Sequence, residues 1–396
     1  MKRIAFSIVP IVCLSNFLLS CDSVDKYIAD DPSRIVQLEL FDSLLIDQLS
    51  PMHLHDLNLD FGLALLMDKE KQLYLTDLKG NIQQNYNLVN DGPEGVGEMG
   101  AQGYKFLDDS HFIAQGFLNG YFLYDLQGKL IQKTPHNTEN LFRVMIYRGR
   151  TTFHPFFKDG EVYVLGEEPN FFSDDDMDPK KHGAGIYEKI SAVFRYNLKK
   201  AENELLETFP PTWEPRANQR YVGNKFAFVA MHDSKKSYAL LPLSGSQLFI
   251  YNMDAEVSLQ NEISLHHPQR PDLAPNMSFE APNEFDDYPV FSNLLYAGDY
   301  CLVQFHTKIP EAKMKSFRAK SEQYYSLPEY KEALKTYVKP YFILVKNGHQ
   351  IGIINDLPVN GTVEFLDKNG TLYINDNTNP KVERDYNVFY KLRIVE

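Results

Sequence analysis

One short pattern recurs along the chain, and it constrains the fold more than any other feature of the sequence. Residues 73–81 and 121–129 each read as a β-strand that ends in the same tight turn, Asp-Leu-x-Gly. Weaker copies of the strand follow at residues 193–199, 248–254, 341–348 and 388–394. Six spaced copies of one unit are typical of repeat architectures, in which no single unit can bury its apolar face alone.

Each copy belongs to a group of four predicted strands. A hairpin precedes the copy, as at residues 104–114, where the turn at 108–110 (Asp-Asp-Ser) has the composition expected of a hairpin. A further strand follows each of the first five copies, but the chain stops after the sixth. Residues 34–41 supply a lone strand near the start, which can complete the sixth group.

These groups predict an all-β fold, a six-bladed β-propeller closed by its N-terminal strand. Radial repetition of four-stranded sheets protects their edges, and the 24 Tyr and 27 Phe favour strands. The propeller is expected to span residues 34–396 as one domain. A β-sandwich, or two unrelated β-domains, is the alternative.

Long connections are expected on only one face of the ring. If the strands of a blade are lettered a to d from the axis outward, the a–b and c–d turns share one face, and the b–c and d–a connections share the other. The longest b–c connections are insertions at residues 167–190 in blade three and 308–340 in blade five. Because long loops on a rigid scaffold often carry function, we expect the b–c/d–a face to bind the ligand. Loop drift without function is the alternative.

The insertion at residues 308–340 contains a short predicted helix. Ser326 and Glu329 have capping-box spacing, and Tyr330, Leu334 and Tyr337 recur at helical intervals. The insertion has eight basic and four acidic residues, so it is locally positive on an acidic protein. It could dock an anionic partner or balance the acidic surface around it.

The N-terminal segment predicts export and lipidation. Two basic residues precede an apolar stretch at residues 4–19, which is too short for a dependable membrane span. The stretch ends in Leu-Leu-Ser-Cys at Cys21, the pattern of a lipobox, in which the cysteine is lipidated and anchors the protein to a membrane. We expect a signal peptide at residues 1–20 and a lipidated tether at 21–33. An ordinary secretory signal with a chance cysteine is the alternative.

Charge and motifs narrow the classes of function. A net charge of −13 argues against a nucleic-acid partner. The glycine pattern at residues 95–100 leads into a strand instead of a helix, so it predicts no dinucleotide site, and no cofactor is expected. His53 and His55 lack the further ligands of a metal site, so no metal is expected. Cys301 lies in an apolar strand and is expected to be a buried, inert thiol.

Charged residues at or before the innermost strands of blades three, four and five are the candidate ligand-binding residues. They are Arg143, Arg148, Arg150, His154, Arg216, Arg220, Asp286 and Asp287. Arginine suits bidentate recognition of carboxylate or phosphate, so the set predicts a site for a protein or for a polar small-molecule or glycan ligand. Pairing of these residues with one another, to plug the channel, is the alternative.

Two features resemble a known group of proteins. The lipobox at Cys21 and the segment at residues 90–99 before the second blade are similar to those of the TolB-like six-bladed propeller lipoproteins of Bacteroidetes, within a domain-of-unknown-function group. The resemblance implies a lipid-anchored protein of the cell envelope, at the outer membrane, and it transfers no catalytic residues. The leading interpretation is a non-enzymatic binding module. A propeller hydrolase or lyase that acts on a glycan or peptide at the channel mouth is the alternative.

Overall fold

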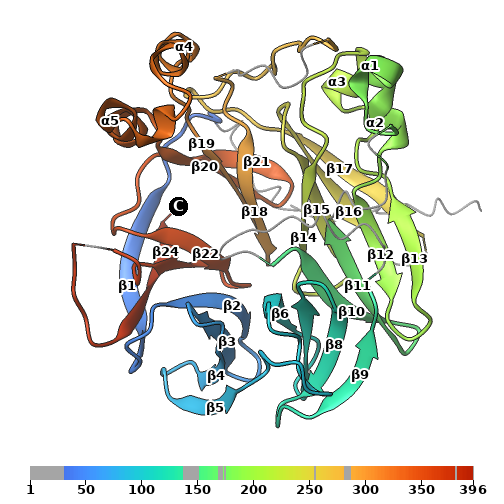
Figure 1. Ribbon diagram of the computed structural model, residues 1–396, viewed down its shortest axis with the longest axis vertical. Coiled ribbons are helices and arrows are strands. Elements are labelled where there is room, and N and C mark those ends of the chain that lie inside the picture. Colours follow the sequence, from blue (N-terminus) through green and yellow to red (C-terminus); the bar gives the residue numbers. More distant parts are fainter. Residues whose placement is uncertain are drawn as a thin grey trace, which may run out of the picture. The chain divides into compact units, whose positions relative to one another are not determined.

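The fold consists of six four-stranded antiparallel β-sheets arranged around one axis (Figure 1). A computed structural model describes residues 31–136, 151–167, 173, 175–253, 256–280, 287–379 and 381–395. The sheets follow one another along the chain, and each contains strands in the order expected of a propeller blade.

Blades one to three run from the axis outward in chain order. Blade one consists of β2 (Met52–Asn58), β3 (Leu63–Asp68), β4 (Leu73–Asp77) and β5 (Ile82–Tyr86). Blade two consists of β6 (Ala101–Phe106), β7 (His111–Gly116), β8 (Gly120–Asp125) and β9 (Leu130–Thr134). Blade three consists of β10 (Phe153–Lys158), β11 (Glu161–Glu167), β12 (Val193–Asn197) and β13 (Glu202–Leu206).

Blades four and five follow the same order, and blade six uses both ends of the described chain. Blade four consists of β14 (Ala227–Met231), β15 (Ser237–Pro242), β16 (Gln247–Asn252) and β17 (Ser258–Ser264). Blade five consists of β18 (Phe291–Ala297), β19 (Tyr300–His306), β20 (Pro340–Lys346) and β21 (His349–Ile354). Blade six consists of β22 (Thr362–Leu366), β23 (Thr371–Asn375), β24 (Asn387–Val395) and β1 (Gln37–Ile46).

The blades form a closed ring. Inner strands of successive blades contact one another, as in the pairs β2 and β6, β14 and β18, and β18 and β22. The ring closes because β22 of the last blade contacts β2 of the first. The predicted six-bladed β-propeller is therefore confirmed.

The N-terminal strand closes the sixth blade, as the sequence predicts. β1 pairs antiparallel with β24 from Gln37 opposite Val395 to Ile46 opposite Asn387. Just before β1, Ile35 forms a parallel bridge with Ile353 of β21, so the N-terminal segment also joins blade five. The segment thus fastens two neighbouring blades and covers the backbone groups of β24 that would otherwise remain unpaired.

The repeated Asp-Leu-x-Gly pattern is a turn that joins the two outer strands of a blade. In blade one, the Asp77 carboxylate accepts hydrogen bonds from the backbone N–H groups of Lys79 and Asn81, both at 2.9 Å. Gly80 has φ of +90°, which favours glycine, and a Cβ there would lie 1.7 Å from the carbonyl oxygen of Leu45 in β1. The polar atoms of the pattern thus form hydrogen bonds within the turn, so the pattern has a structural role in the blade.

The insertion in blade five contains two helices. The sequence predicted one of them, and the other was not expected. These are α4 (Glu311–Lys320) and α5 (Pro328–Tyr337), joined through the 3₁₀ turn η3 (Tyr324–Ser326). The predicted capping box is wrong, because the N-cap of α5 is Leu327 and the Ser326 hydroxyl instead donates to the Gln323 carbonyl oxygen at 2.8 Å. Proline at position 328 starts the helix one residue later than the box requires.

The insertion in blade three also contains short helices, which the sequence did not reveal. They are α1 (Pro179–His182), the 3₁₀ turn η2 (Gly183–Gly185) and α2 (Ile186–Lys189). Ile186 and Tyr187 are buried, and the Tyr187 ring meets the Trp213 ring edge to face at 4.8 Å between centroids. Helices this short show no apolar period, so only the packing that they make in the folded ring reveals them.

Leu44 offers a direct test of ring closure. Its side chain is 1% exposed and packs among apolar residues of blades one and six, whereas the neighbouring Leu45 is 49% exposed. We expect Leu44→Ala to lower the free energy of unfolding by about 2–4 kcal/mol, because it leaves a cavity at the closure. Leu45→Ala, the matched control, should change it by about 0.5 kcal/mol or less. Urea denaturation of both variants measures the difference, and equal losses would contradict the described packing of β1.

Candidate functional site

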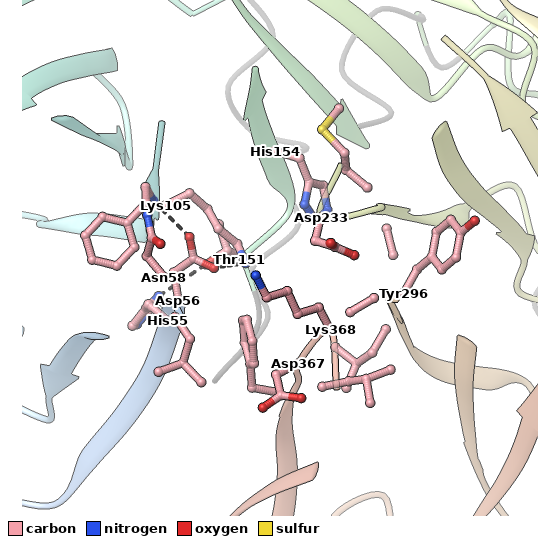
Figure 2. A pocket seen from close by; sticks show the side chains of 18 of the residues that line it. His55, Asp56, Asn58, Lys105, Thr151, His154, Asp233, Tyr296, Asp367 and Lys368 are labelled. Atoms are coloured by element: carbon pink, nitrogen blue, oxygen red, sulfur yellow. Dashed lines mark hydrogen bonds and ion pairs between the residues drawn. The ribbon is translucent and has the colours of Figure 1, made fainter. Parts of the chain in front are cut away.

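A cavity of about 250 Å³ lies on the axis of the ring, between the innermost strands of the blades (Figure 2). Every innermost strand contributes to its lining. One residue from each, in chain order, is Asp56, Lys105, His154, Met231, Tyr296 and Glu364. The site therefore exists only in the closed ring, since no single blade contains more than a part of it.

The cavity reaches the face of the ring that carries the short turns. Its lining includes Asp60, Asp233, Lys235 and Lys368, which lie in the a–b turns of blades one, four and six. The a–b and c–d connections contain at most five residues each, and the long insertions lie between strands b and c. The cavity thus approaches the face opposite to the one that the sequence predicts for ligand binding.

One buried ion pair occupies one side of the cavity. The Lys105 Nζ lies 3.0 Å from the Asp56 Oδ1, and both side chains are largely buried. The other oxygen of Asp56 accepts a hydrogen bond from the backbone N–H of Phe106 at 2.9 Å. Figure 2 shows this pair at one side of the cavity, with Asp233 and Tyr296 at the other. A buried pair with this many bonds holds two neighbouring blades in a defined arrangement.

The other carboxylates of the lining also have fixed donors. Glu364 accepts hydrogen bonds from the backbone N–H of Leu54 at 2.8 Å and from the Asn375 amide at 2.7 Å, and its other contact is the His53 ring. Asp367 accepts from backbone N–H groups of its own turn. Asp233 accepts from the backbone N–H of Gly298 at 2.7 Å, and Asp60 pairs with Lys368. Glu364, Asp233 and Asp60 therefore join neighbouring blades, whereas Asp367 stabilises its own turn.

Lys235 is the exception among the charged groups of the lining. It lies in the turn between β14 and β15, and its ammonium forms no ion pair or side-chain hydrogen bond with the described residues. Burial lowers its pKa, the Asp56 carboxylate opposes this shift, and the Lys105 ammonium adds to it. The Asp233 carboxylate of the same turn also favours the charged form of Lys235.

His55 is a neutral, buried ring beside the cavity. Its Nδ1 lies 3.2 Å from the Thr151 hydroxyl, and its Nε2 has no hydrogen-bond partner among the described residues. Burial, reinforced by the nearby charges of His53 and Lys105, lowers the pKa of His55 to about 3. Among the described residues, no group of three or more His, Cys, Asp or Glu side chains is arranged to hold a metal ion.

Of the eight predicted ligand-binding residues, the four that the structure describes do not gather at one place. Arg143, Arg148, Arg150 and Asp286 lie outside the described residues, as does the predicted lipidation site Cys21. Of the others, only His154 lines the axial cavity, where its Nε2 lies 3.1 Å from the Val229 carbonyl oxygen.

The two described arginines among the predictions are engaged in local contacts. Arg216 lies in the short helix α3 (Glu214–Ala217), and its guanidinium lies 3.1 Å from the Glu207 carboxylate. Arg220 binds both oxygens of the Glu214 carboxylate. Neither residue lines the axial cavity. Their carboxylate partners, Glu207 and Glu214, are not members of the predicted set.

Asp287 lines a separate, open groove among the long connections. The groove has a volume of about 600 Å³ and lies between the loop before β18 and the start of the blade-five insertion. Gln269, Leu273 and Lys308 also line it. The Asp287 carboxylate accepts a hydrogen bond from the backbone N–H of Glu311, at the start of α4, at 3.1 Å. Asp287 therefore helps to seat the helical insertion on the ring.

The charged residues that do line the cavity, apart from His154, were not predicted from the sequence. Asp56, Lys105 and Lys235 belong to three blades and are far apart in the chain. One signal could have indicated them: each lies at or just beyond the end of an innermost strand, where alternating side chains point toward the axis. Cys301, in contrast, is confirmed as a buried thiol, and burial raises its pKa.

The pH dependence of stability tests the environment of His55. The pKa of His55 is about 3 in the folded protein and about 6.5 in the unfolded chain, so acid favours the unfolded chain, which takes up the proton. The stabilisation is complete above pH 6.5 and is lost as the pH falls toward 3. Between pH 7 and pH 5 this residue should account for a loss of about 2 kcal/mol.

Comparison of two histidine variants isolates this effect. His55→Gln should lose less stability than the wild type between pH 7 and pH 5, as measured by urea denaturation at each pH. His349→Gln, at an exposed position of β21, should behave as the wild type. If His55→Gln and the wild type lose the same free energy of unfolding on acidification, His55 is not a buried neutral ring in the folded protein.

Comparison with known proteins supports the fold. No family model matches the chain, and no curated protein matches it. A solved structure of a DUF4221 family member from Bacteroides vulgatus is similar, with a TM-score of 0.60 at 14% identity over 91% of this chain and 99% of that chain. A Bacteroides fragilis protein described as exported gives a TM-score of 0.52 at 10% identity over 91% and 96% of the two chains. At such identities the likeness establishes a shared fold.

Proposed function

We propose that the protein is a lipid-anchored binding module of the cell envelope that holds a small polar ligand in its axial cavity. The observation that supports this most directly is the convergence of polar side chains from all six blades on one cavity. Concave sites with a few convergent polar groups are the usual form of a ligand site. A volume of about 250 Å³ favours a small molecule over a protein segment.

The contacts of the carboxylates favour binding over hydrolysis. A glycosidase needs one carboxyl group free to donate a proton and a second free to act on sugar or water. In this cavity Asp56, Asp60, Asp233, Glu364 and Asp367 each already accept hydrogen bonds or form an ion pair with fixed partners. These bonds give the carboxylates an architectural role, so the hydrolase or lyase alternative has no specific support.

The proposed site differs from the sequence prediction in the face that it uses. The long connections do form a groove, but its described lining is rich in proline and includes few charged side chains, Asp287 and Lys308 among them. The axial cavity combines charged, amide and aromatic side chains in a more enclosed space. Enclosure matters because polar contacts are stronger where water is excluded.

The envelope location rests on the lipobox and on one structural neighbour. Cys21 follows the apolar N-terminal stretch, and the similar Bacteroides fragilis protein is described as exported. None of the helices within the described residues is long and apolar enough to span a membrane. A cysteine-linked lipid anchor would attach such a chain to the envelope, and we assign it to the outer membrane by the resemblance noted above.

Blocking the cavity tests the binding proposal. Asn58 lines the cavity at the end of β2, and Asn58→Trp should fill part of it. Gln269→Trp places the same bulk in the groove of the long connections and serves as the matched control. We expect ligands found in a thermal-shift panel of monosaccharides, dipeptides and organic acids to lose at least tenfold in affinity with Asn58→Trp, as measured by titration calorimetry.

The two variants separate the two faces. Loss of binding in Gln269→Trp alone would assign the ligand to the long connections and contradict the proposed site. If both variants bind the ligand as the wild type does, neither the axial cavity nor the groove is the binding site. Melting temperatures of the free variants show that each one is folded.

Lipidation has its own test at Cys21. Expression with a radiolabelled or alkyne-tagged fatty acid should label the wild-type protein, and Cys21→Ser should abolish the label because the acceptor thiol is lost. The wild type should then fractionate with membranes and the variant with soluble proteins. Cys301→Ser is the matched control and should keep the label. Labelling that persists in Cys21→Ser would contradict the lipid anchor.

A further inference from the structure

The charges of the axial cavity favour neither an anionic nor a cationic ligand. The described lining holds three lysines and five carboxylates, which are those of Asp56, Asp60, Asp233, Glu364 and Asp367. An anion would meet the excess of carboxylates, and two of the lysines are already paired with two of them. A cation would meet the lysines, and each carboxylate already binds a fixed donor. A neutral ligand that both donates and accepts hydrogen bonds avoids both conflicts.

Two carboxylates at the mouth of the cavity each keep one oxygen available. The Oδ1 of Asp60 pairs with Lys368, and the Oδ1 of Asp233 accepts from the backbone N–H of Gly298 at 2.7 Å. The second oxygen of each forms no hydrogen bond or ion pair with the described residues. The two side chains are 69% and 40% exposed, so these oxygens can be reached from the short-turn face. A carboxylate oxygen held in this way accepts a hydrogen bond from a hydroxyl group.

Two carboxamides add neutral donors to the same cavity. Asn58 lines it from blade one and Asn293 from blade five. The Oδ1 of each accepts a backbone hydrogen bond, from Phe61 at 3.3 Å and from Leu294 at 2.9 Å. The amide NH₂ groups donate to none of the described residues. Because the backbone bonds fix which atom is oxygen, the NH₂ group is the part of each side chain that a ligand oxygen can use.

An exposed aromatic ring completes the lining. Phe61 lies in the turn between β2 and β3, lines the cavity and is 53% exposed. The Phe365 ring, which also lines the cavity, packs edge to face against Tyr373 at 6.1 Å between centroids. The Phe61 ring makes no such contact with the described residues. A large apolar ring left open beside hydrogen-bonding groups suits a ligand that has an apolar face as well as polar edges.

We infer that the ligand of the axial cavity is a neutral sugar unit. A sugar ring has a C–H face, which packs on the Phe61 ring, and hydroxyl groups, which both donate and accept. The hydroxyls donate to the free oxygens of Asp60 and Asp233 and accept from the amides of Asn58 and Asn293. Figure 2 shows Asn58 and Asp233 on opposite sides of the cavity, so a ligand between them can use both. The inference rests on the proposed binding function and adds the chemical class of the ligand.

Neutral sugars and altered counterparts test the inference by titration calorimetry at constant ionic strength. The neutral probes are the methyl glycosides of glucose, galactose and mannose, together with N-acetylglucosamine. Sorbitol keeps the hydroxyls without the ring, and glucuronate and protonated glucosamine keep the ring with a charge. We expect at least one neutral ring sugar to bind, and its acyclic and charged counterparts to bind more weakly by about threefold or more.

Variants of the lining show which groups hold the sugar. Phe61→Ala removes the ring, and Phe41→Ala is the matched control because Phe41 is a phenylalanine of similar exposure (47%) in β1, away from the cavity. Asn293→Leu removes a donor at similar size. We expect Phe61→Ala and Asn293→Leu each to weaken sugar binding by about threefold or more, and Phe41→Ala to bind as the wild type.

A second variant guards against misfolding as the cause of lost binding. Phe61→Tyr keeps an aromatic face at the same position, so it should bind the sugar as the wild type does. The melting temperature of Phe61→Ala should match that of the wild type, because the ring is exposed and supports no apolar cluster of the described core. Sugar binding that is equal in Phe61→Ala and the wild type would overturn the inference.

The outcomes distinguish this inference from the proposed function. A charged probe or a dipeptide that binds more tightly than every neutral sugar, and that Asn58→Trp blocks, would overturn the inference and keep the proposed function. Sugar binding that Gln269→Trp abolishes and Asn58→Trp leaves intact would overturn both, as would absence of binding by every probe.

Discussion

The pairing of β1 with β24 is the interaction on which the rest of the structure depends. A propeller leaves no free ends only if its first and last blades are joined, and here the N-terminal strand completes the last blade. The bridge from Ile35 to Ile353 extends the join to blade five, where Gly352 permits a close approach of the chain. Leu44 and Ile46 then place apolar side chains between blades six and one. Strands from both ends of the described chain thus form one sheet, in which β1 covers the edge of β24.

Closure also creates the axial cavity and sets its chemistry. Six innermost strands end near one another only in the complete ring, so polar side chains from different blades meet there. Asp56 and Lys105 form an ion pair between blades one and two, and Lys235 of blade four lines the same cavity. Most charges near the axis stabilise the arrangement of the blades. Lys235 is different, because it is the lysine of the described lining that forms no ion pair.

The sequence predicted the features that are local and repeated. The turn at Asp77 and Gly80 was recognisable because a tight turn depends on a few neighbouring residues. Repetition of the strand and its turn then gave the number of blades. The cap at Ser326 was wrong because a proline moved the start of the helix by one residue. The cavity was not predicted, since Asp56 and Lys105 meet only through the order of blades around the ring. The long connections led to the prediction of a ligand site on one face of the ring, whereas the charged and polar side chains come together at the axis.

Hydrogen exchange of β1 measures the central claim, closure of the ring by the N-terminal strand, most directly. The backbone N–H groups of residues 37–46 that pair with β24 should exchange as slowly as those of β24 itself, because both strands are released only when the sixth blade opens. Protection of β1 that disappears in step with that of β24 as urea is added would support the account. Rapid exchange of β1 beside a protected β24 would contradict it, since the ring would then be closed without its N-terminal strand.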